Sequence, residues 1–262
     1  MERWRGRLVR AMSSGAWLLS AAGKAVTYAS AGLMRRRDLG RAIERGWDEY
    51  GRGAWASQPG FMEWEDEFYS RFLRPADQVL LVGCGAGRDL VPLLQRGFAA
   101  AGLDLGSEAI AACRRNLERR GLSAPLYVGS VRDAEVEGSF DCVIFSWFCY
   151  GYLPGSGERV AGLRRLKSLL RPGGRVLLSY LRNEPPLSRV PCGLARLLSR
   201  LSFSDWTPEH GDYIEMWRGR GEPVLHFEHR FAPGELRREA EAAGLSLAFE
   251  EERAHSCAVL TG

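Results

Sequence analysis

Three glycines at alternate positions, Gly83, Gly85 and Gly87, follow a short apolar run, and Asp104 lies seventeen positions after the last of them. Glycines in this pattern allow a tight turn and let a ligand approach the backbone closely. The amides at the start of a following helix favour a polar or anionic group. The carboxylate of Asp104 can accept hydrogen bonds from both hydroxyls of a ribose. The pattern therefore predicts a site for a nucleoside cofactor.

The glycines alone are weak evidence, because a tight connection between a strand and a helix can carry the same residues. The surrounding elements strengthen the prediction. Short runs rich in Val, Leu, Ile and Phe predict buried strands just before Gly83 and over Phe98–Leu103, Phe140–Phe145 and Arg175–Tyr180. Helices are expected to begin at Arg88 and to cover Leu163–Leu170, the second stopped by Pro and Gly. This alternation with short connections predicts an α/β fold with a parallel sheet covered on both faces.

At this point the chain resembles the class I S-adenosylmethionine-dependent methyltransferases, over roughly 77–180 and again over 231–262. The residues that carry the resemblance are V-L-L-V-G-C-G-A-G (79–87), Asp104, Y-V-G-S-V-R-D (127–133), F-D-C-V-I-F-S-W (140–147) and L-K-S-L-L-R-P-G-G-R-V-L-L-S (166–179). The resemblance implies a Rossmann-like, mostly parallel seven-stranded sheet with a final antiparallel strand pair. It also implies an N-terminal helical cap, and an inserted helix and β-hairpin over the active site. The implied cofactor is S-adenosyl-L-methionine, with S-adenosyl-L-homocysteine as product.

The resemblance assigns the cofactor to the glycine turn and to the ends of the next strands. The cofactor-binding residues that it implies are Gly83, Cys84, Gly85, Gly87, Asp89, Asp104, Leu105, Ser130, Val131, Ser146 and Trp147. Two positions depart from the family pattern: Leu81 and Ser130 stand where acidic residues are usual. A serine hydroxyl can still bond to the adenine amino group. A non-catalytic cofactor-binding regulatory module remains an alternative to an enzyme.

Composition divides the chain into five regions. These are a basic and apolar N-terminal arm (1–40), a helical lead-in or cap (41–76), the cofactor-binding core (77–182), a substrate-side insertion (183–231) and a C-terminal completion of the sheet (232–262). The 262 residues lie near the upper limit for a single hydrophobic core. Six scattered cysteines without a C-x-x-C pair favour a reducing cytoplasm, and four histidines without ligand spacing predict no metal.

The N-terminal arm is strongly basic, with eight cations and one acid in residues 1–37. A membrane-spanning helix is not expected, because Lys24 lies in the middle and strongly apolar residues are few. Three alternatives remain: an amphipathic helix on an anionic membrane surface with Trp4, Trp17 and Tyr28 as anchors, a lid over the active-site mouth, and a less favoured signal peptide. The simplest interpretation of the segment, beside these three, is a partly disordered basic arm. The expected location is cytoplasmic, with peripheral contact at the inner membrane surface if the first alternative holds.

Acceptor-binding residues are expected on both sides of the core. In the lead-in, Trp64, Phe68 and Phe72 recur at helical spacing and are expected to pack on the sheet. Tyr50 and Trp55 lie in a Gly-rich stretch and are the better pocket candidates. In the insertion, a helix is expected over Leu187–Leu201 and a hairpin over 213–230. The substrate-binding residues predicted there and after the third strand are Tyr213, Trp217 and Tyr150.

Methyl transfer requires alignment in a dry pocket, and an oxygen or nitrogen acceptor usually also needs a base. The catalytic candidates are His229, His226 and Tyr150. The two histidines are three apart on a strand, so they point to opposite faces. The sequence has no N-P-P-Y or D-P-P-Y run after the third strand, which argues against methylation of nucleobases, and no basic stripe predicts nucleic-acid binding. The expected function is O- or N-methylation of a small or medium organic acceptor; a lipid or quinone precursor is the alternative if the arm contacts a membrane.

Overall fold

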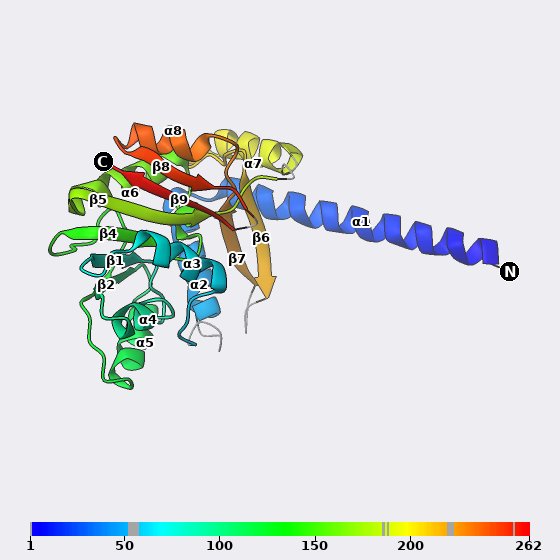
Figure 1. The fold of residues 1–262 in the computed structure, drawn as a ribbon. Coiled ribbons are helices and arrows are strands. Elements are labelled where there is room, and N and C mark those ends of the chain that lie inside the picture. The colour runs from blue at the N-terminus through cyan, green and yellow to red at the C-terminus, as the bar shows by residue number, and fades with distance from the viewer. Residues whose placement is uncertain (1, 52–57, 185–186, 188, 219–222, 254) are drawn as a thin grey trace.

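The computed structural model describes residues 2–51, 58–184, 187, 189–218, 223–253 and 255–262. Figure 1 shows a twisted sheet with helices on both faces and one long helix that projects from the body. The helices are α1 (Glu2–Leu33), α2 (Arg36–Gly51), α3 (Glu63–Phe72), α4 (Leu90–Gln95), α5 (Ser107–Glu118), the 3₁₀ helix η2 (Cys149–Tyr152), α6 (Ser156–Leu169), α7 (Arg189–Leu201) and α8 (Glu235–Ala242). The strands are β1 (Gln78–Val82), β2 (Ala99–Asp104), β3 (Leu126–Val128), β4 (Phe140–Phe145), β5 (Leu170–Tyr180), β6 (Asp212–Arg218), β7 (Pro223–His229), β8 (Ser246–Glu251) and β9 (Ser256–Thr261).

The main sheet has seven strands in the order β3-β2-β1-β4-β5-β9-β8. The first five are parallel, whereas β9 runs antiparallel to both β5 and β8. This confirms the Rossmann-like α/β sheet with a final antiparallel pair. In register, Val82 lies opposite Leu103 on one side and Phe145 on the other. The residues that follow these three strands therefore emerge at one edge of the sheet.

Alternate residues of β1 point into two separate cores. Leu80 and Val82 lie in a buried cluster with residues of α6 and α8, and Val79 and Leu81 lie in another with residues of α3, α4 and α5. Phe68 belongs to the second cluster, and Trp64 and Phe72 pack against it, so these aromatics lie where their helical spacing predicted. Each face of the sheet is covered by helices, as the near-continuous apolar strands require.

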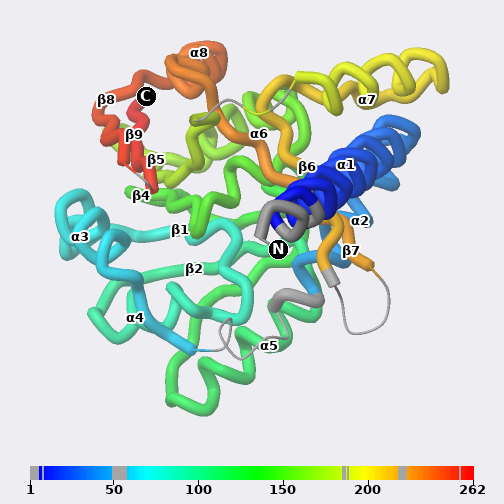
Figure 2. Tube along the Cα trace, turned by 90° about the vertical axis from the view of Figure 1, so that its right-hand side faces the viewer, coloured from blue at the N-terminus to red at the C-terminus, as the bar shows by residue number. Residues whose placement is uncertain are grey.

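A third core joins segments that are far apart in the sequence. It contains buried residues of α1, α2, α7, β6 and β7, including Tyr28, Ile43 and Phe227, and Trp206 from the connection between α7 and β6. The strands β6 and β7 pair as an antiparallel hairpin of their own. Figure 2 shows these helices and the hairpin together at one side of the sheet. The inserted helix and hairpin are confirmed, and α2 packs on the hairpin, where a Cβ on Gly46 would lie 2.8 Å from the carbonyl oxygen of Leu225.

Several boundaries differ from the predictions. Helix α4 begins at Leu90 rather than Arg88, and α6 begins seven residues before Leu163, at Ser156. Strand β5 begins at Leu170, so the expected stop signal lies inside it. The pairing register between β4 and β5 shifts there: Phe140 pairs with Leu170, but Cys142 pairs with Arg175. Helix α2 crosses the boundary that composition suggested at residue 40.

The N-terminal arm is one helix, α1, that leaves the body beside α7 (Figure 1). Its last turns pack against α7 and β6. None of the described helices is long and apolar enough to cross a membrane. Tyr28, an expected membrane anchor, is instead buried, and its hydroxyl donates to the carbonyl oxygen of Asp212 at 2.8 Å.

Candidate cofactor and acceptor site

The glycine turn connects β1 to α4 at the carboxyl edge of the sheet. Gly83, Gly85 and Gly87 all have positive φ, which side chains disfavour. A Cβ on Gly83 would overlap the sulfur of Cys149, whereas a Cβ on Gly85 would enter open space. The two glycines therefore serve different purposes. Gly83 lets the turn pack against the chain after β4, and Gly85 keeps a cavity clear.

Asp104 ends β2 and faces this turn. Its Oδ2 accepts from the amide of Gly85 at 2.8 Å, and its Oδ1 accepts from the amide of Gly106 at 2.9 Å. Burial raises the pKa of Asp104, although these amide bonds act in the opposite sense. Each carboxylate oxygen has two acceptor sites and uses one for an amide. The fixed carboxylate can therefore accept two further hydrogen bonds from the cavity, as a ribose diol requires.

A cavity runs from Asp104 to the end of β4. The predicted cofactor residues that line it are Gly83, Cys84, Gly85, Asp104, Leu105, Ser130, Val131, Ser146 and Trp147. Ser130 accepts from the amide of Arg132 at 3.2 Å, and its hydroxyl proton is still available to a ligand. Most lining residues are apolar or glycine. The polar side chains of the lining are those of Glu44, Asp48, Arg88, Asp104, Ser130 and Ser146. Such a cavity fits an adenosine group.

Two predicted cofactor residues are not among the described residues that line the cavity. A Cβ on Gly87 would lie 3.0 Å from the sulfur of Cys113, so this glycine allows the turn to pack on α5. Asp89 is buried and accepts from Arg88 at 2.9 Å and from the hydroxyl of Ser146. Both residues support the site indirectly. Arg88, which we did not single out in the sequence, lines the cavity instead.

Arg88 belongs to a buried charge network beneath the cavity. Its Nη2 donates to Glu65 at 2.5 Å, and its guanidinium lies 4.8 Å from the ring centre of Trp147. Burial, and then the charge of Asp89, raise the pKa of Glu65 to about 7. Trp147 and Phe148 both have positive φ, an unfavourable conformation for bulky residues that is often found at functional sites. The network therefore fixes the chain just after β4, where the resemblance puts the transferred methyl.

Helix α2 forms the opposite wall. Ile43, Glu44, Trp47 and Asp48 occupy one face of the helix and line the cavity. Asp48 is near enough to Asp104 to raise the pKa of its carboxyl. The arm 1–37, expected as one alternative to cover the mouth, contributes no residue to the lining among those described. The helical cap is therefore confirmed in α2, where the lining residues end at Asp48, before Tyr50 and Trp55 in the sequence. The side chain of Tyr50, and Trp55 as a whole, lie outside the described residues.

An aromatic group connects the cavity to the hairpin. Trp47 and Tyr152 line the cavity with ring centres 4.4 Å apart. Behind them, His226 stacks on Trp217 at 3.8 Å and lies 6.4 Å from Tyr213. His226 is buried, with its Nε2 3.5 Å from Glu228. His226 thus packs against the side of Trp47 and Tyr152 that faces away from the cavity, together with Tyr213 and Trp217. None of these three is among the described residues that line the cavity.

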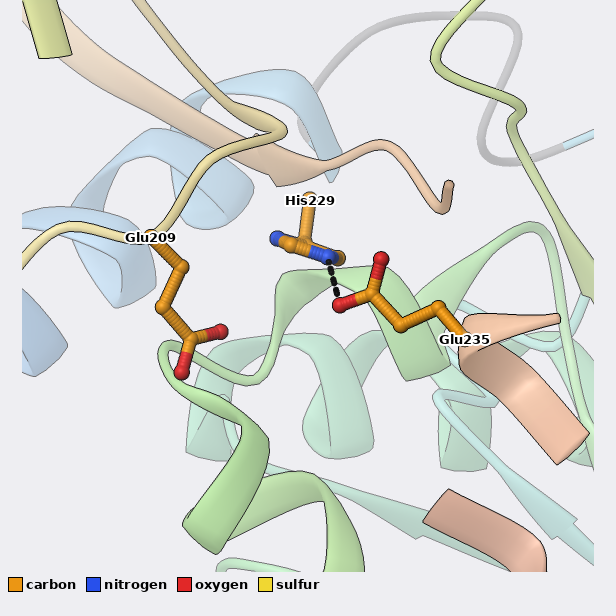
Figure 3. A group of neighbouring side chains, drawn as sticks. All are labelled: Glu209, His229 and Glu235. Atoms are coloured by element: carbon orange, nitrogen blue, oxygen red, sulfur yellow. Dashed lines mark hydrogen bonds and ion pairs between the residues drawn. The ribbon is translucent and has the colours of Figure 1, made fainter. Parts of the chain in front are cut away.

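His229 and Tyr150 lie in a different place from the cavity. The Nδ1 of His229 is 2.7 Å from Asp212. Its Nε2 is 3.0 Å from Glu235, the contact drawn in Figure 3. Burial opposes a charge on the ring, but these bonds raise the pKa of His229 to about 9. A ring protonated at neutral pH cannot accept a proton. The hydroxyl of Tyr150 donates to Glu239 at 2.6 Å, and burial raises its pKa well above the usual value. Neither residue is among the described residues that line the cavity, so the structure does not bring these two catalytic candidates, or Tyr150 as a substrate-binding candidate, to the cofactor site.

Three side chains offer atoms of the kind that bind metal ions, within 4.8 Å of one another: Glu209, His229 and Glu235 (Figure 3). The guanidinium of Arg159 lies 3.0 Å from Glu209 and 3.5 Å from Glu235, and it is fully buried. Together with His229, it supplies the positive charge that the carboxylates need. The group is therefore an ion-pair network that joins α6, α8 and the hairpin.

Comparison with known proteins agrees with this geometry. Residues 79–174 match the model of a methyltransferase domain family. A ubiquinone biosynthesis O-methyltransferase of Xanthomonas axonopodis pv. citri is 32% identical over 152 residues, which are 57% of this chain and 62% of that protein. One of Xanthomonas campestris pv. campestris is 30% identical over the same length. The aligned part thus spans about three fifths of these relatives.

Solved structures share the fold. The CcbJ methyltransferase of Streptomyces caelestis has a TM-score of 0.58 at 16% identity and covers 76% of this chain and 88% of its own. A S-adenosylmethionine-dependent methyltransferase of Methanosarcina mazei has a TM-score of 0.58 at 20% identity, covering 74% of this chain and 95% of its own. These likenesses cover the sheet, its helices and its order of elements.

Proposed function

We propose that the chain binds S-adenosyl-L-methionine and methylates a hydroxyl of a small organic acceptor, leaving S-adenosyl-L-homocysteine. The match of residues 79–174 to a methyltransferase domain family and the fold shared with S-adenosylmethionine-dependent methyltransferases support this proposal. One observation carries the proposal: the glycine turn and the doubly anchored Asp104 open on a cavity whose other wall is aromatic. The cofactor supplies a sulfonium-bound methyl group that an acceptor oxygen can attack directly.

The residues of the chain bind and orient the reactants. Asp104 accepts hydrogen bonds from the ribose, and Leu105, Ser130 and Val131 enclose the adenine. The charge network of Arg88 holds Ser146 and Trp147 in place, so that the reacting atoms meet in a fixed geometry. The apolar walls exclude water, which would otherwise compete with the acceptor.

The acceptor is proposed to be a planar aromatic compound with a hydroxyl group, such as a quinone precursor. Trp47 and Tyr152 give the cavity an aromatic wall, on which a ring can stack. The relatives named as ubiquinone biosynthesis O-methyltransferases support an oxygen acceptor of this kind. A hydroxyl is a better nucleophile once its proton has been removed.

We assign the removal of this proton to Glu44. It lies on the face of α2 that lines the cavity, about one turn before Trp47 and Asp48. His226 is the alternative base, but the rings of Trp47 and Tyr152 separate it from the cavity in the described structure.

Calorimetric titration with S-adenosyl-L-methionine tests the cofactor. We expect wild type to bind and Asp104→Asn to bind about 10- to 100-fold more weakly, because hydrogen bonds to a charged group are lost. Asp133→Asn is the matched control, an exposed aspartate of the adenine segment, and should bind like wild type. Lack of binding by wild type at high micromolar cofactor would refute the proposal.

Transfer of a labelled methyl group to a catechol tests the reaction. Glu44→Gln should lower kcat about 100-fold or more with little change in cofactor affinity, whereas the exposed Glu63→Gln should not. A comparable loss in His226→Gln with full activity in Glu44→Gln would move the base to His226. Binding of the cofactor without transfer to any acceptor would favour the non-catalytic regulatory module.

A further inference from the structure

Helix α7 leaves an apolar face in solvent. The exposed side chains on it and just after it are Val190 (79%), Leu194 (37%), Leu197 (53%), Leu201 (67%) and Phe203 (92%). The first four recur at intervals of four, three and four residues, so they form one stripe along the helix. The opposite face, with Cys192, Ala195 and Ser199, is buried in the third core. The stripe is therefore not needed to attach the helix to the body.

The same segment carries only positive charge. Arg189, Arg196 and Arg200 are exposed, and no acidic residue occurs from 187 to 204. Among the described residues, no ion pair is recorded for these arginines. Phe203 follows the helix and is 92% exposed. Its positive φ of 52° belongs to the C-terminal cap of α7, in which the amide of Ser204 donates to the carbonyl oxygen of Ser199 at 2.9 Å. The cap thus leaves the ring of Phe203 in solvent beside the stripe.

Helix α1 also carries exposed apolar side chains and an excess of positive charge. A Cβ on Gly32 would overlap the carbonyl oxygen of Ala195, so α1 and α7 cross at very close range. Beyond that crossing α1 projects from the body (Figure 1). Its exposed Met12, Leu19, Val26 and Leu33 are seven residues apart, and residues 1–37 hold eight cations and one acid.

We propose that the exposed face of α7, assisted by α1, docks on the surface of an anionic phospholipid bilayer. The apolar stripe enters the boundary between head groups and acyl chains, and the arginines contact lipid phosphates while their stems lie along the apolar surface. Charge complementarity selects this occupant. A second copy on the same face would bring arginines against arginines and lose affinity. The inference does not rest on methyl transfer, but a membrane-bound enzyme could receive an acceptor that carries a lipid tail.

Co-sedimentation of the full chain with vesicles tests the surface. Wild type should pellet with mixed phosphatidylglycerol and phosphatidylcholine, much less with phosphatidylcholine alone, and less as salt is added. Arg196→Gln with Arg200→Gln should weaken binding about thirtyfold, because each basic residue near an anionic surface contributes to binding. Leu197→Glu with Leu201→Glu should abolish it. Val128→Glu, an exposed apolar residue on β3, is the control and should pellet like wild type.

Two results would overturn the proposal. One is a wild-type chain that stays in the supernatant with anionic vesicles. The other is a stable dimer by light scattering that the Leu197→Glu, Leu201→Glu variant converts to monomer, which would assign the face to a second copy. Each variant is also titrated with S-adenosyl-L-methionine, because α7 does not line the cavity among the described residues. Unchanged cofactor binding shows that the variant is folded, and it separates failure of the surface from failure of the proposed enzyme.

Discussion

The ion pairs of His229 should make the stability of the protein depend on pH. His229 lies on β7, and its ring contacts Asp212 at the start of β6 and Glu235 at the start of α8. It therefore joins the hairpin to the core. The variant His229→Gln keeps a polar side chain of similar length but cannot carry the charge. We expect it to unfold more easily than wild type below neutral pH.

The magnitude follows from the pKa. The bonds to Asp212 and Glu235, acting against burial, raise the pKa of His229 from 6.5 to about 9. Since one pKa unit corresponds to about 1.4 kcal/mol, protonation contributes on the order of 3 kcal/mol to the free energy of unfolding. The folded state binds the proton more tightly than the unfolded state. The contribution is therefore complete below about pH 6.5 and is lost as the pH rises through about 9.

Urea unfolding of both proteins between pH 6 and pH 10 would measure this. The difference in unfolding free energy between wild type and His229→Gln should shrink by about 3 kcal/mol over that range, because groups common to both proteins cancel. If the wild-type advantage over His229→Gln is the same at pH 6 and pH 10, His229 is not charged in the folded protein and the reasoning fails.

Further variants separate packing from binding. Gly83→Ala should lower the free energy of unfolding by about 1–3 kcal/mol in thermal or urea melts, since its methyl would meet Cys149 at positive φ. Gly85→Ala should be milder in the same melts but should weaken cofactor binding in calorimetry, since its methyl would enter the cavity; a larger effect on stability than on affinity would contradict the assignment. Tyr150→Phe should cost about 1–3 kcal/mol by removing the hydrogen bond of the hydroxyl to the Glu239 carboxylate, which keeps its bonds from Arg159, while KM for the acceptor should not change. An altered KM at wild-type stability would return Tyr150 to the acceptor site.

The cofactor half of the site could be predicted because its residues follow consecutive strands. The ends of parallel neighbouring strands meet at one edge, so the glycine turn, Asp104 and Ser146 come together once the order of strands is known. Gly87 and Asp89 are not among the described residues that line the cavity, for a local reason. They share the turn with true lining residues, and only the direction of each side chain separates a residue that lines the cavity from one that packs beneath it.

The acceptor half could not be predicted in this way. Glu44 and Trp47 approach the cavity only because α2 packs on the hairpin, more than 170 residues away in the sequence. The histidines show the same limit. Their spacing correctly predicted opposite faces of β7, but not which face held the charged network. The carboxylates of Asp212 at the start of β6 and of Glu235 at the start of α8 bond the ring of His229 and raise its pKa.

The sequence by itself determined the sheet, the order of its elements and the nucleoside site, because these depend on local periodicity and on glycines that no other residue can replace. The tertiary structure alone decided which helix covers the cavity, which histidine is charged and which apolar side chains remain in solvent. Those properties depend on contacts between distant segments. The exposed stripe of α7 is an example. Its spacing in the sequence is that of any amphipathic helix, whose apolar face would be expected to be buried. Only the packing of α7 shows that the opposite face is buried and that the stripe remains in solvent.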